Sequence, residues 1–408
     1  MEVRGVYLKI LMITQNFYPE IGSAGNRMKT IFLMLKQKGY HVDVLTTEPT
    51  YPSRDIYSQE DFWNEQDIDI DRNRVTRLSV QNKKYSSNFF SRLFYYLEIM
   101  LKMFFYVQKD KNQYDIVFVT SPPIFVAFVG LAAKYRYNAK LLLDVRDLWP
   151  ESLKGVGVFN RSYIIWLFEK MESTLYKKAD HIIINSEGFI DHFKNKCDGL
   201  TKKLIFLPNA ARKKETMLEK RKGDSMFNVV YAGNIGLAQD VTILMQLAKK
   251  LSEHHISLNV IGYGVQKQAF TDFVRRHNLK NVELIKPMGR QDCLNRMSRC
   301  DVGIATLNNS RVFETVLPGK IIDYLTCRLP VVASLSGYSK QLIENEKIGF
   351  VTSRQSVDEM VDYILKLYND PALLEEMQSN CREFIEKKFL WENNINKLTN
   401  LLDKMAKG

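Results

Sequence analysis

The sequence is poor in cysteine and has no cysteine arrangement that is typical of zinc binding. Its five cysteines form no Cys-x-x-Cys pair and have no histidine at zinc-site spacing: Cys197, Cys293, Cys300, Cys327 and Cys381. We therefore expect no structural metal. The sequence predicts a reduced, cytoplasmic protein with no metal and no cofactor.

Long hydrophobic runs are also missing. A helix that spans a bilayer needs about 20 predominantly apolar residues, and no segment of this chain provides them. The apolar run near the amino terminus is too short for a secretory signal, and its Lys9–Ile13 part is typical of a β-strand. We therefore expect no transmembrane helix.

Acidic residues are outnumbered by basic ones, 46 against 58, and the chain has a net charge of +12. Such a chain is attracted to phosphates, nucleic acids and anionic membranes. Nine basic and three acidic residues fall within residues 71–111, where aromatic residues are interleaved with them. No recognised RNA- or DNA-binding module accompanies this segment, so we favour an anionic membrane surface and expect no nucleic-acid partner.

With 408 residues, the chain is longer than one hydrophobic core usually serves. Short apolar segments alternate with helical periodicity, which is typical of parallel sheets covered by helices on both faces. The fold class is therefore α/β, with two Rossmann-like, doubly wound domains. Strands are predicted at residues 8–13, 42–45, 116–119, 141–143, 182–184 and 204–206, and again at 227–231, 258–261, 282–285, 302–305 and 331–333.

Residues 211–225 interrupt this pattern, because they are polar and charged without apolar periodicity. They are predicted to form an exposed linker. This division gives an N-terminal domain at residues 1–210 and a C-terminal domain at residues 226–383. Residues 384–408 are predicted to form a further helix, which we expect to pack back on the N-terminal domain.

Two glycine-rich turns follow predicted strands of the C-terminal domain. Gly233, Asn234 and Gly236 lie between a strand and a helix, and Gly262 and Gly264 end the next strand. Such a turn lets backbone amides approach a diphosphate at the positive end of a helix. An ordinary tight turn also favours glycine, and this alternative stays open.

The segment Pro318-Gly319-Lys320 is a third candidate element of this domain. Gly319 can expose backbone amides, and Lys320 can offset phosphate charge. Asp323 lies one helical turn further on, where its carboxylate could accept hydrogen bonds from ribose hydroxyls. An ordinary amphipathic helix with Lys320 and Asp323 in solvent is the alternative.

In the N-terminal domain, charged residues follow the strand predicted at residues 141–143. Asp144, Arg146, Asp147 and Glu151 lie at the carboxyl end of that strand, where functional residues of this architecture often lie. A purely structural salt-bridge cluster is the alternative. The glycine- and serine-containing loop at residues 19–27 follows the first strand in the same way.

These segments resemble the large family of retaining glycosyltransferases with the GT-B fold, which includes bacterial lipopolysaccharide, capsule and mannosyl transferases. The similarity spans nearly the whole chain and includes Asn185-Ser186-Glu187 and Leu207-Pro208-Asn209-Ala210. More narrowly, the segments DVRDLWPES and YAGNIG are similar to the N-acetyl-L-fucosamine transferase branch of O-antigen and capsule assembly.

The resemblance implies a UDP-sugar donor, for example UDP-linked N-acetyl-L-fucosamine or another N-acetylated deoxyhexosamine. It also implies that the two domains face a central cleft. The sugar would be transferred, without a metal, to a polyprenyl-diphosphate-linked saccharide. The implied donor-binding residues are Gly22, Ser23, Gly233, Asn234, Gly236, Gly262, Gly264, Glu314, Thr315, Pro318, Gly319, Lys320 and Asp323. The implied acceptor-side residues are Asn26, Arg27, Asp144 and Asn209.

Stabilisation of the departing diphosphate is the main catalytic effect that the resemblance implies. The predicted catalytic residues are Arg146, Asp147, Glu151 and Lys320, with Asp147 and Glu151 as acid/base candidates by position. Asp323 matches the second acid of the family's Glu-x7-Glu pair.

The sequence departs from the family pattern at three places. The position of the first acid of the Glu-x7-Glu pair is Thr315, beside Glu314, and Arg146 stands where many relatives have histidine. The basic residues that often follow the second-domain glycine loop are missing, so Lys320 is expected to carry more of the phosphate charge. A GT-B isomerase of nucleotide sugars and a non-catalytic subunit of a polysaccharide machine stay open as alternatives.

The predicted membrane contact lies within residues 83–111. Its apolar residues recur at helical spacing: Leu93, Phe94, Leu97, Met100, Leu101, Phe104 and Phe105. Lys83, Lys84, Arg92 and Lys102 are available to anionic headgroups. We predict a peripheral protein on the inner face of the cell membrane, and a core helix of the N-terminal domain is the alternative.

Overall fold

The computed structural model describes residues 8–63, 72–81, 89–155, 162–197, 199–218, 226–352 and 355–407. It divides into two compact units. The first unit comprises Met1–Pro208 together with Asn394–Gly408, and the second comprises Asn209–Asn393. In the described residues, no helix is long and apolar enough to cross a membrane.

The first unit contains a parallel sheet of seven described strands in the order β3-β2-β1-β4-β5-β6-β7. The strands are β1 (Lys9–Ile13), β2 (His41–Thr47), β3 (Val75–Leu78), β4 (Ile116–Ser121), β5 (Lys140–Val145), β6 (His181–Ile184) and β7 (Leu204–Phe206). The strand order reverses between β1 and β4, which is where ligands of such sheets usually bind. The sequence missed β3, because this half-buried strand includes Thr76 and Arg77 and is not a continuous apolar run.

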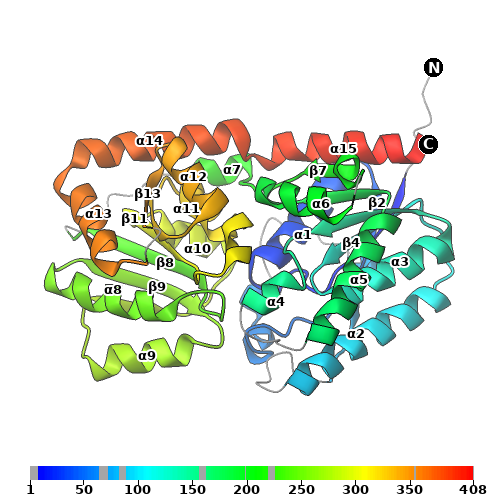
Figure 1. The fold of residues 1–408 in the computed structure, drawn as a ribbon, viewed down its shortest axis with the longest axis horizontal. Helices are drawn as coiled ribbons and strands as arrows, with labels where there is room; N and C mark the ends of the chain where they lie inside the picture. The colour runs from blue at the N-terminus through cyan, green and yellow to red at the C-terminus, as the bar shows by residue number, and fades with distance from the viewer. Residues whose placement is uncertain are drawn as a thin grey trace. The chain divides into compact units, whose positions relative to one another are not determined.

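Helices cover the sheet of the first unit. They are α1 (Ser23–Gln37), α2 (Phe89–Lys109), α3 (Ile124–Tyr137), α4 (Glu151–Gly155), α5 (Ser162–Lys178), α6 (Ile190–Lys196) and α15 (Trp391–Lys407), with short 3-10 helices at Asp55–Ser58, Glu60–Phe62, Arg72–Arg74, Glu187–Phe189 and Leu200–Lys203. Helix α3 packs against both α2 and α5 (Figure 1).

The second unit contains a parallel sheet of six described strands in the order β10-β9-β8-β11-β12-β13. The strands are β8 (Asn228–Asn234), β9 (Ser257–Tyr263), β10 (Val282–Ile285), β11 (Val302–Thr306), β12 (Val331–Ser334) and β13 (Gly349–Thr352). Its helices are α7 (Lys213–Thr216), α8 (Val241–Glu253), α9 (Lys267–Arg276), α10 (Arg290–Met297), α11 (Gly319–Thr326), α12 (Gly337–Asn345), α13 (Val357–Asn369) and α14 (Pro371–Lys388), with a 3-10 helix at Arg311–Thr315. The predicted α/β class with two Rossmann-like sheets is thus confirmed.

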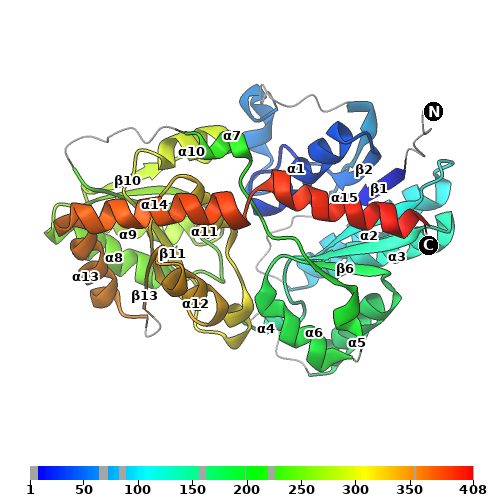
Figure 2. The same cartoon turned by 90° about the horizontal axis from the view of Figure 1, so that it is seen from above.

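The core of the second unit lies between the sheet and one layer of helices. Leu244 and Leu247 of α8, Phe270 of α9 and Ile364 of α13 pack in one buried cluster with residues of β8, β9 and β11. Figure 2 shows α12 and α14 in front of the sheet, whereas α8 and α9 lie behind it. Both faces of the strands are therefore covered, which explains why they are nearly continuous apolar runs.

The predicted linker at residues 211–225 is only partly correct as an exposed connection. Residues 211–218 are described, and within them Ala211 forms a bridge with Leu390 while the Glu215 side chain is 1% exposed. Glu215 is buried because Arg212 and Arg290 bind its carboxylate. Residues 219–225 lie outside the described residues.

The predicted helix at residues 384–408 is in fact two helices. Helix α14 ends at Lys388 and α15 begins at Trp391, with Phe389 and Trp391 both buried around this break. The Tyr40 hydroxyl donates a hydrogen bond of 2.6 Å to Asp403 Oδ1 and so holds α15 on the first unit.

Candidate functional site

Lys320 places a buried ammonium group at the carboxyl edge of the second sheet. Its Nζ atom is buried, has no hydrogen-bond partner among the described residues, and lies 3.7 Å from the centroid of the Tyr231 ring. Burial lowers the pKa of this ammonium to about 7. Leaving such a group unpaired costs about 1–3 kcal/mol, so a bound anion at this point would remove an existing penalty.

Tyr324 fixes the position of Lys320, which precedes it by one turn of α11. The Tyr324 hydroxyl accepts a hydrogen bond from Ala232 N and donates one to Ile304 O, both at 2.8 Å. Its ring covers Gly303, where a Cβ atom would lie 2.5 Å from the ring. The helix is therefore held against β8 and β11, with its amino terminus at the ends of these strands.

The glycines of the two predicted phosphate turns have different roles. A Cβ atom would lie 2.2 Å from Asn234 Oδ1 at Gly264 and 2.5 Å from Asn234 Nδ2 at Gly236. At Gly262 it would lie 2.7 Å from another side chain of the loop after β8. At Gly233, with φ at +117°, the nearest such atom is Lys320 Cε at 3.8 Å. Packing explains three of these glycines, whereas at Gly233 a Cβ atom would only be in ordinary van der Waals contact with Lys320.

Asp323 belongs to a charge network that the sequence did not predict. Arg290 at the start of α10 donates to Asp323 Oδ1 at 2.8 Å and binds both oxygens of Glu215 at 2.9 and 3.1 Å. Burial raises the pKa of Asp323, and it would also raise that of Glu215, but Arg290 holds the Glu215 pKa at about 2. The Asp323 side chain is 31% exposed, so it can still accept a hydrogen bond from a ligand.

The segment before α11 contains the remaining predicted donor residues. Thr315 Oγ1 donates to Val312 O at 2.8 Å, and Glu314 is exposed on the same 3-10 helix. Pro318 is the N-cap of α11, and Gly319 is its first residue. No side chain caps this helix and no acidic residue lies in its first turn, so its free amides can bind an anion.

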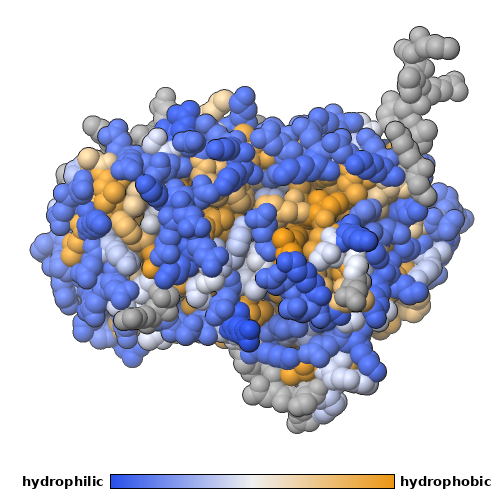
Figure 3. Space-filling view, turned by 45° about the horizontal axis from the view of Figure 1, so that its top comes forward, coloured by the Kyte–Doolittle hydropathy of each residue, from blue (hydrophilic) through white to orange (hydrophobic). Residues whose placement is uncertain are grey.

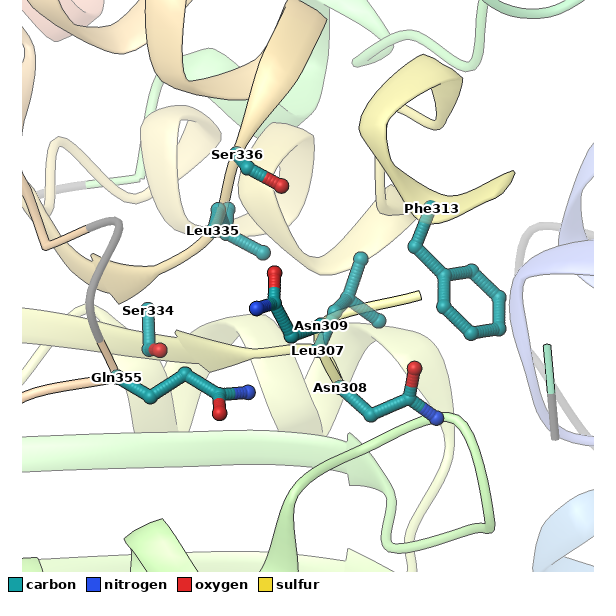
Figure 4. A pocket seen from close by; sticks show the side chains of 8 residues that line it. All are labelled: Leu307, Asn308, Asn309, Phe313, Ser334, Leu335, Ser336 and Gln355. Carbon is teal, nitrogen blue, oxygen red and sulfur yellow. The ribbon is translucent and has the colours of Figure 1, made fainter. Parts of the chain in front are cut away.

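A small pocket lies beside these elements, at the carboxyl ends of β11 and β12 (Figure 4). Ser334 lines it, and the Ser334, Thr306 and Thr352 hydroxyls are buried, in register, and without partners among the described residues. The pocket volume is about 10 Å³, which is room for about one water molecule. A pocket of this size has no room for a substrate. It is lined by Leu307, Asn308, Asn309, Phe313, Ser334, Leu335, Ser336 and Gln355.

In the first unit, the amino terminus of α1 lies after β1, as predicted for the loop that contains Gly22 and Ser23. Gly22 is the N-cap with φ at +119°, and Ser23 is the first helical residue. No side chain caps α1, its first turn has no acidic residue, and Asn26 N donates to Gly22 O at 3.1 Å. This terminus has the geometry of a second anion-binding position.

Arg27 and Asp144 were predicted on the acceptor side, but the structure places both inside the first unit. Arg27 donates two hydrogen bonds, of 3.0 and 2.8 Å, to the Asp144 carboxylate. Their side chains are 1% and 0% exposed, so an acceptor cannot reach them and they join α1 to β5. Asn209 is half-buried and is the first residue of the second unit, not part of the N-terminal domain.

Asp147 and Arg146 follow β5, as the sequence predicted. Burial raises the pKa of the Asp147 carboxyl to about 6, and a hydrogen bond from Ser152 and the charge of Arg146 oppose this rise. Arg146 Nη2 donates to Pro122 O at 3.0 Å, whereas its buried Nε has no partner among the described residues. A carboxyl with this pKa can exchange a proton near neutral pH.

Glu151 lies in a cluster that the sequence missed, together with Glu172, His192 and Lys196. The possible ligand atoms of Glu151, Glu172 and His192 lie within 4.8 Å of one another, a spacing that could hold a metal ion. Lys196 Nζ, however, contacts the Glu172 carboxylate and lies 3.7 Å from Glu151 Oε1. The ammonium of Lys196 already occupies this position and compensates part of the carboxylate charge, so the cluster suits a metal cation poorly.

Two family models match the chain in succession. Residues 22–210 match the model described as Glycosyl transferase 4-like domain, and residues 213–386 match Glycosyl transferases group 1. The putative colanic acid biosynthesis glycosyl transferase WcaI of Escherichia coli is 21% identical over 96% of this chain and 99% of its own length. The probable glycosyltransferase WbjE of Pseudomonas aeruginosa is 22% identical over 58% of this chain and 62% of its own length.

Solved structures agree on the architecture. Sucrose-phosphate synthase from Thermosynechococcus elongatus superposes with a TM-score of 0.73 at 17% identity, over 98% of this chain and 99% of that one. HepE of Anabaena, solved in complex with UDP-glucose, superposes with a TM-score of 0.70 at 16% identity, over 97% and 100% of the chains. The expected GT-B fold is confirmed.

Proposed function

We propose that this chain, a group 1 glycosyltransferase with a 4-like first domain, transfers a sugar from a UDP-linked donor to a lipid-linked saccharide in capsule or O-antigen assembly. The observation that carries this proposal is the unpaired, buried ammonium of Lys320, which lies beside Gly233 of the loop after β8. A nucleoside diphosphate supplies the anion that this arrangement lacks. The likeness to WcaI, a putative colanic acid glycosyl transferase, supports polysaccharide assembly.

In this proposal the second unit binds the donor through its diphosphate. Lys320 and the free amides at the start of α11 bind the phosphate oxygens and stabilise the negative charge that develops as the sugar leaves. Asp323, oriented by Arg290, accepts hydrogen bonds from the ribose, and Glu314 or Thr315 contacts the sugar. We favour an N-acetylated deoxyhexosamine such as N-acetyl-L-fucosamine, and a reaction that needs no metal.

We further propose that transfer retains the anomeric configuration. The acceptor hydroxyl would attack on the face from which the diphosphate oxygen leaves, and its proton would pass to a base of the protein. Lys320 would stabilise that oxygen, and Asp147 and Glu151 are the acid/base candidates of the first unit. The Asp147 pKa of about 6 suits proton exchange.

The acceptor, a polyprenyl-diphosphate-linked saccharide, requires the protein at the inner face of the cell membrane. Helix α2 supports this requirement because it has two apolar faces. The core face consists of buried residues that are 0%, 1%, 0% and 0% exposed: Tyr95, Ile99, Met103 and Val107. The sequence alone did not distinguish this face from the exposed one. Phe94, Leu101, Phe104 and Phe105 are exposed at 58%, 48%, 37% and 56%.

We propose that this exposed face of α2 contacts the membrane, and the core face accounts for the alternative of a core helix. Lys83, Lys84 and the side chain of Arg92 lie outside the part of the chain that the structure describes. Lys102 pairs with Glu98 at 2.8 Å, so its charge is already partly compensated. The apolar contact therefore carries most of the proposed binding by α2.

UDP binding by Lys320→Ala tests the donor proposal directly. A charge-assisted contact is worth about 1.5–3 kcal/mol, so calorimetry should show UDP affinity about tenfold weaker or worse. Lys249→Ala is the matched control, because Lys249 is an exposed lysine on α8 of the same unit. Equal UDP affinity in the wild type and Lys320→Ala would remove the basis of the proposal.

Product analysis completes the test. The wild type is incubated with UDP-N-acetyl-L-fucosamine, with and without a short-chain prenyl-diphosphate saccharide. We expect an acceptor larger by one sugar, with the anomeric configuration retained, only when both substrates are present. A changed sugar nucleotide in the reaction without acceptor would instead indicate an isomerase.

A further inference from the structure

Helix α5 exposes an apolar end followed by a basic end. Tyr163, Trp166 and Leu167, in its amino-terminal half, are 65%, 54% and 50% exposed. Lys170 and Lys177 follow on the same helix and are also exposed. Aromatic and apolar side chains so exposed at one end of a helix are costly in water. Figure 3 shows that hydrophilic residues cover most of the visible face, so exposed apolar clusters are exceptions there.

A groove runs along this helix where α5 meets α6. Its volume is about 470 Å³, and it is lined by Trp166, Glu169, Lys170, Ser173, Thr174, Lys177, Asn195 and Lys196. The space is large enough for a phosphate-containing headgroup. The Ser173 hydroxyl and the Asn195 amide are neutral hydrogen-bonding groups that suit phosphate oxygens, whereas the Thr174 hydroxyl already donates to Lys170 O at 2.8 Å.

The charge of the groove is positive and not internally neutralised. Glu169 lines the groove, but its carboxylate pairs with Lys154 at 2.9 Å, and Lys154 does not line the groove. The carboxylate is therefore compensated from outside. Lys170 Nζ lies 3.8 Å from the centroid of the Trp166 ring. Within the described part of the chain, neither Lys170 nor Lys177 has a carboxylate partner. These two ammonium groups are therefore available to an external anion.

We propose that the groove between α5 and α6 binds the phosphate headgroup of an anionic membrane lipid, with Tyr163, Trp166 and Leu167 at the boundary with the hydrocarbon. A lipid has this same order of chemistry, from acyl chain to phosphate. Tyrosine and tryptophan are enriched at that boundary, and lysines near an anionic surface contribute about 1 kcal/mol each. A soluble phosphate would not require the exposed aromatic end.

The inference rests on the proposed peripheral location, which it extends from α2 to a second helix. Helices α2 and α5 both pack against α3 of the first unit (Figure 1). The groove adds recognition of the headgroup to the apolar contact of α2. Donor binding and transfer to a soluble acceptor do not depend on it.

Sedimentation with vesicles tests the inference, using phosphatidylcholine alone or mixed with phosphatidylglycerol. The double variant Lys170→Glu/Lys177→Glu should bind the anionic vesicles at least about tenfold more weakly than the wild type. The matched control is Lys249→Glu/Lys280→Glu, which makes the same charge change at exposed lysines of the second unit. Equal weakening of both double variants would show a general charge effect and overturn the inference.

Tryptophan fluorescence locates the contact. The emission of the wild type should shift to shorter wavelength with anionic vesicles, and Trp166→Phe should lose this shift. Inorganic phosphate or glycerol phosphate at millimolar concentration should neither produce the shift nor compete with vesicles. Competition by either compound would identify a site for soluble phosphate instead of a lipid.

A variant of α2 separates this inference from the membrane proposal itself. If Phe94→Ser/Phe105→Ser releases the protein while Lys170→Glu/Lys177→Glu and Trp166→Phe behave as the wild type, the groove has no part in binding and the inference is wrong. Loss of binding in both sets supports one surface built from two helices. Unchanged circular dichroism and unchanged UDP affinity confirm that each variant is folded.

Discussion

The two units share a parallel sheet with a reversed strand order, but they differ in where they leave charge unpaired. In the second unit, Arg290, Glu215 and Asp323 neutralise one another, whereas Lys320 has no anion among the described residues. In the first unit, Arg27 and Asp144 form a closed pair, and Asp147 is the buried carboxyl with a pKa near 6. One architecture thus leaves an unpaired ammonium group in one unit and a carboxyl with a raised pKa in the other.

The largest expected effect comes from breaking the closed ion pairs. Arg27→Ala leaves Asp144 charged and buried, which should lower the free energy of unfolding by about 3–5 kcal/mol. Arg290→Ala should cost less, because Asp323 is 31% exposed although Glu215 is 1% exposed. Urea denaturation measures both.

The double variant Arg27→Met/Asp144→Leu is the control for the first pair. It leaves no unpaired charge, so it should recover most of the stability that Arg27→Ala loses. A larger loss for Arg290→Ala than for Arg27→Ala would reverse the ranking of the two pairs.

The next largest effect should separate chemistry from donor binding. Asp147→Ala and Glu151→Ala should reduce kcat about 100-fold or more if they act as acid or base, with UDP affinity largely kept. Asp323→Ala should instead weaken UDP binding, because its proposed partners are ribose hydroxyls. Kinetics and calorimetry on the same preparations make the comparison, and full activity in both Asp147→Ala and Glu151→Ala would exclude the first unit's carboxyls from the reaction.

The pH dependence should differ between the two units. The free-enzyme pKa of Lys320 is about 7, and only the ammonium form binds phosphate well. UDP affinity should therefore be highest below pH 7 and fall above it, by up to about tenfold per pH unit, with proton uptake on binding. Calorimetry in buffers of different ionisation enthalpy measures this uptake.

Asp147 predicts the opposite direction for the rate. As a base it must be deprotonated, so kcat should fall as the pH drops below about 6. In Lys320→Ala the pH dependence of UDP affinity should disappear while that of kcat remains. A pH-independent UDP affinity in the wild type would contradict the assignment of Lys320.

The smallest effect concerns the helix that returns to the first unit. Tyr40→Phe removes the hydrogen bond to Asp403, and such a bond contributes about 0.5–1.5 kcal/mol. The variant should lower the free energy of unfolding of the first unit only slightly and leave UDP binding unchanged. Denaturation followed by a separate probe in each unit makes the measurement. A loss of stability in the second unit would contradict the prediction.

Local patterns were sufficient for most of the fold. All the strands predicted from short apolar runs are present. The strands β3 and β13 were missed, because neither is a continuous apolar run: β3 includes Thr76 and Arg77, and β13 begins with Gly349 and ends with Thr352.

The sequence by itself determined the class of the protein, the two sheets, the positions of Gly233 and Asp147 at strand ends, and that of Lys320 one helical turn before Asp323. These features depend on local periodicity and on residue types next to strands, which are visible along the chain. Only the tertiary structure decided which charges are paired. Glu215 meets Arg290 across 75 residues, and Arg27 meets Asp144 across 117. Because desolvation and pairing arise only when distant segments pack together, burial made Arg27 a structural residue and left Lys320 free for a ligand.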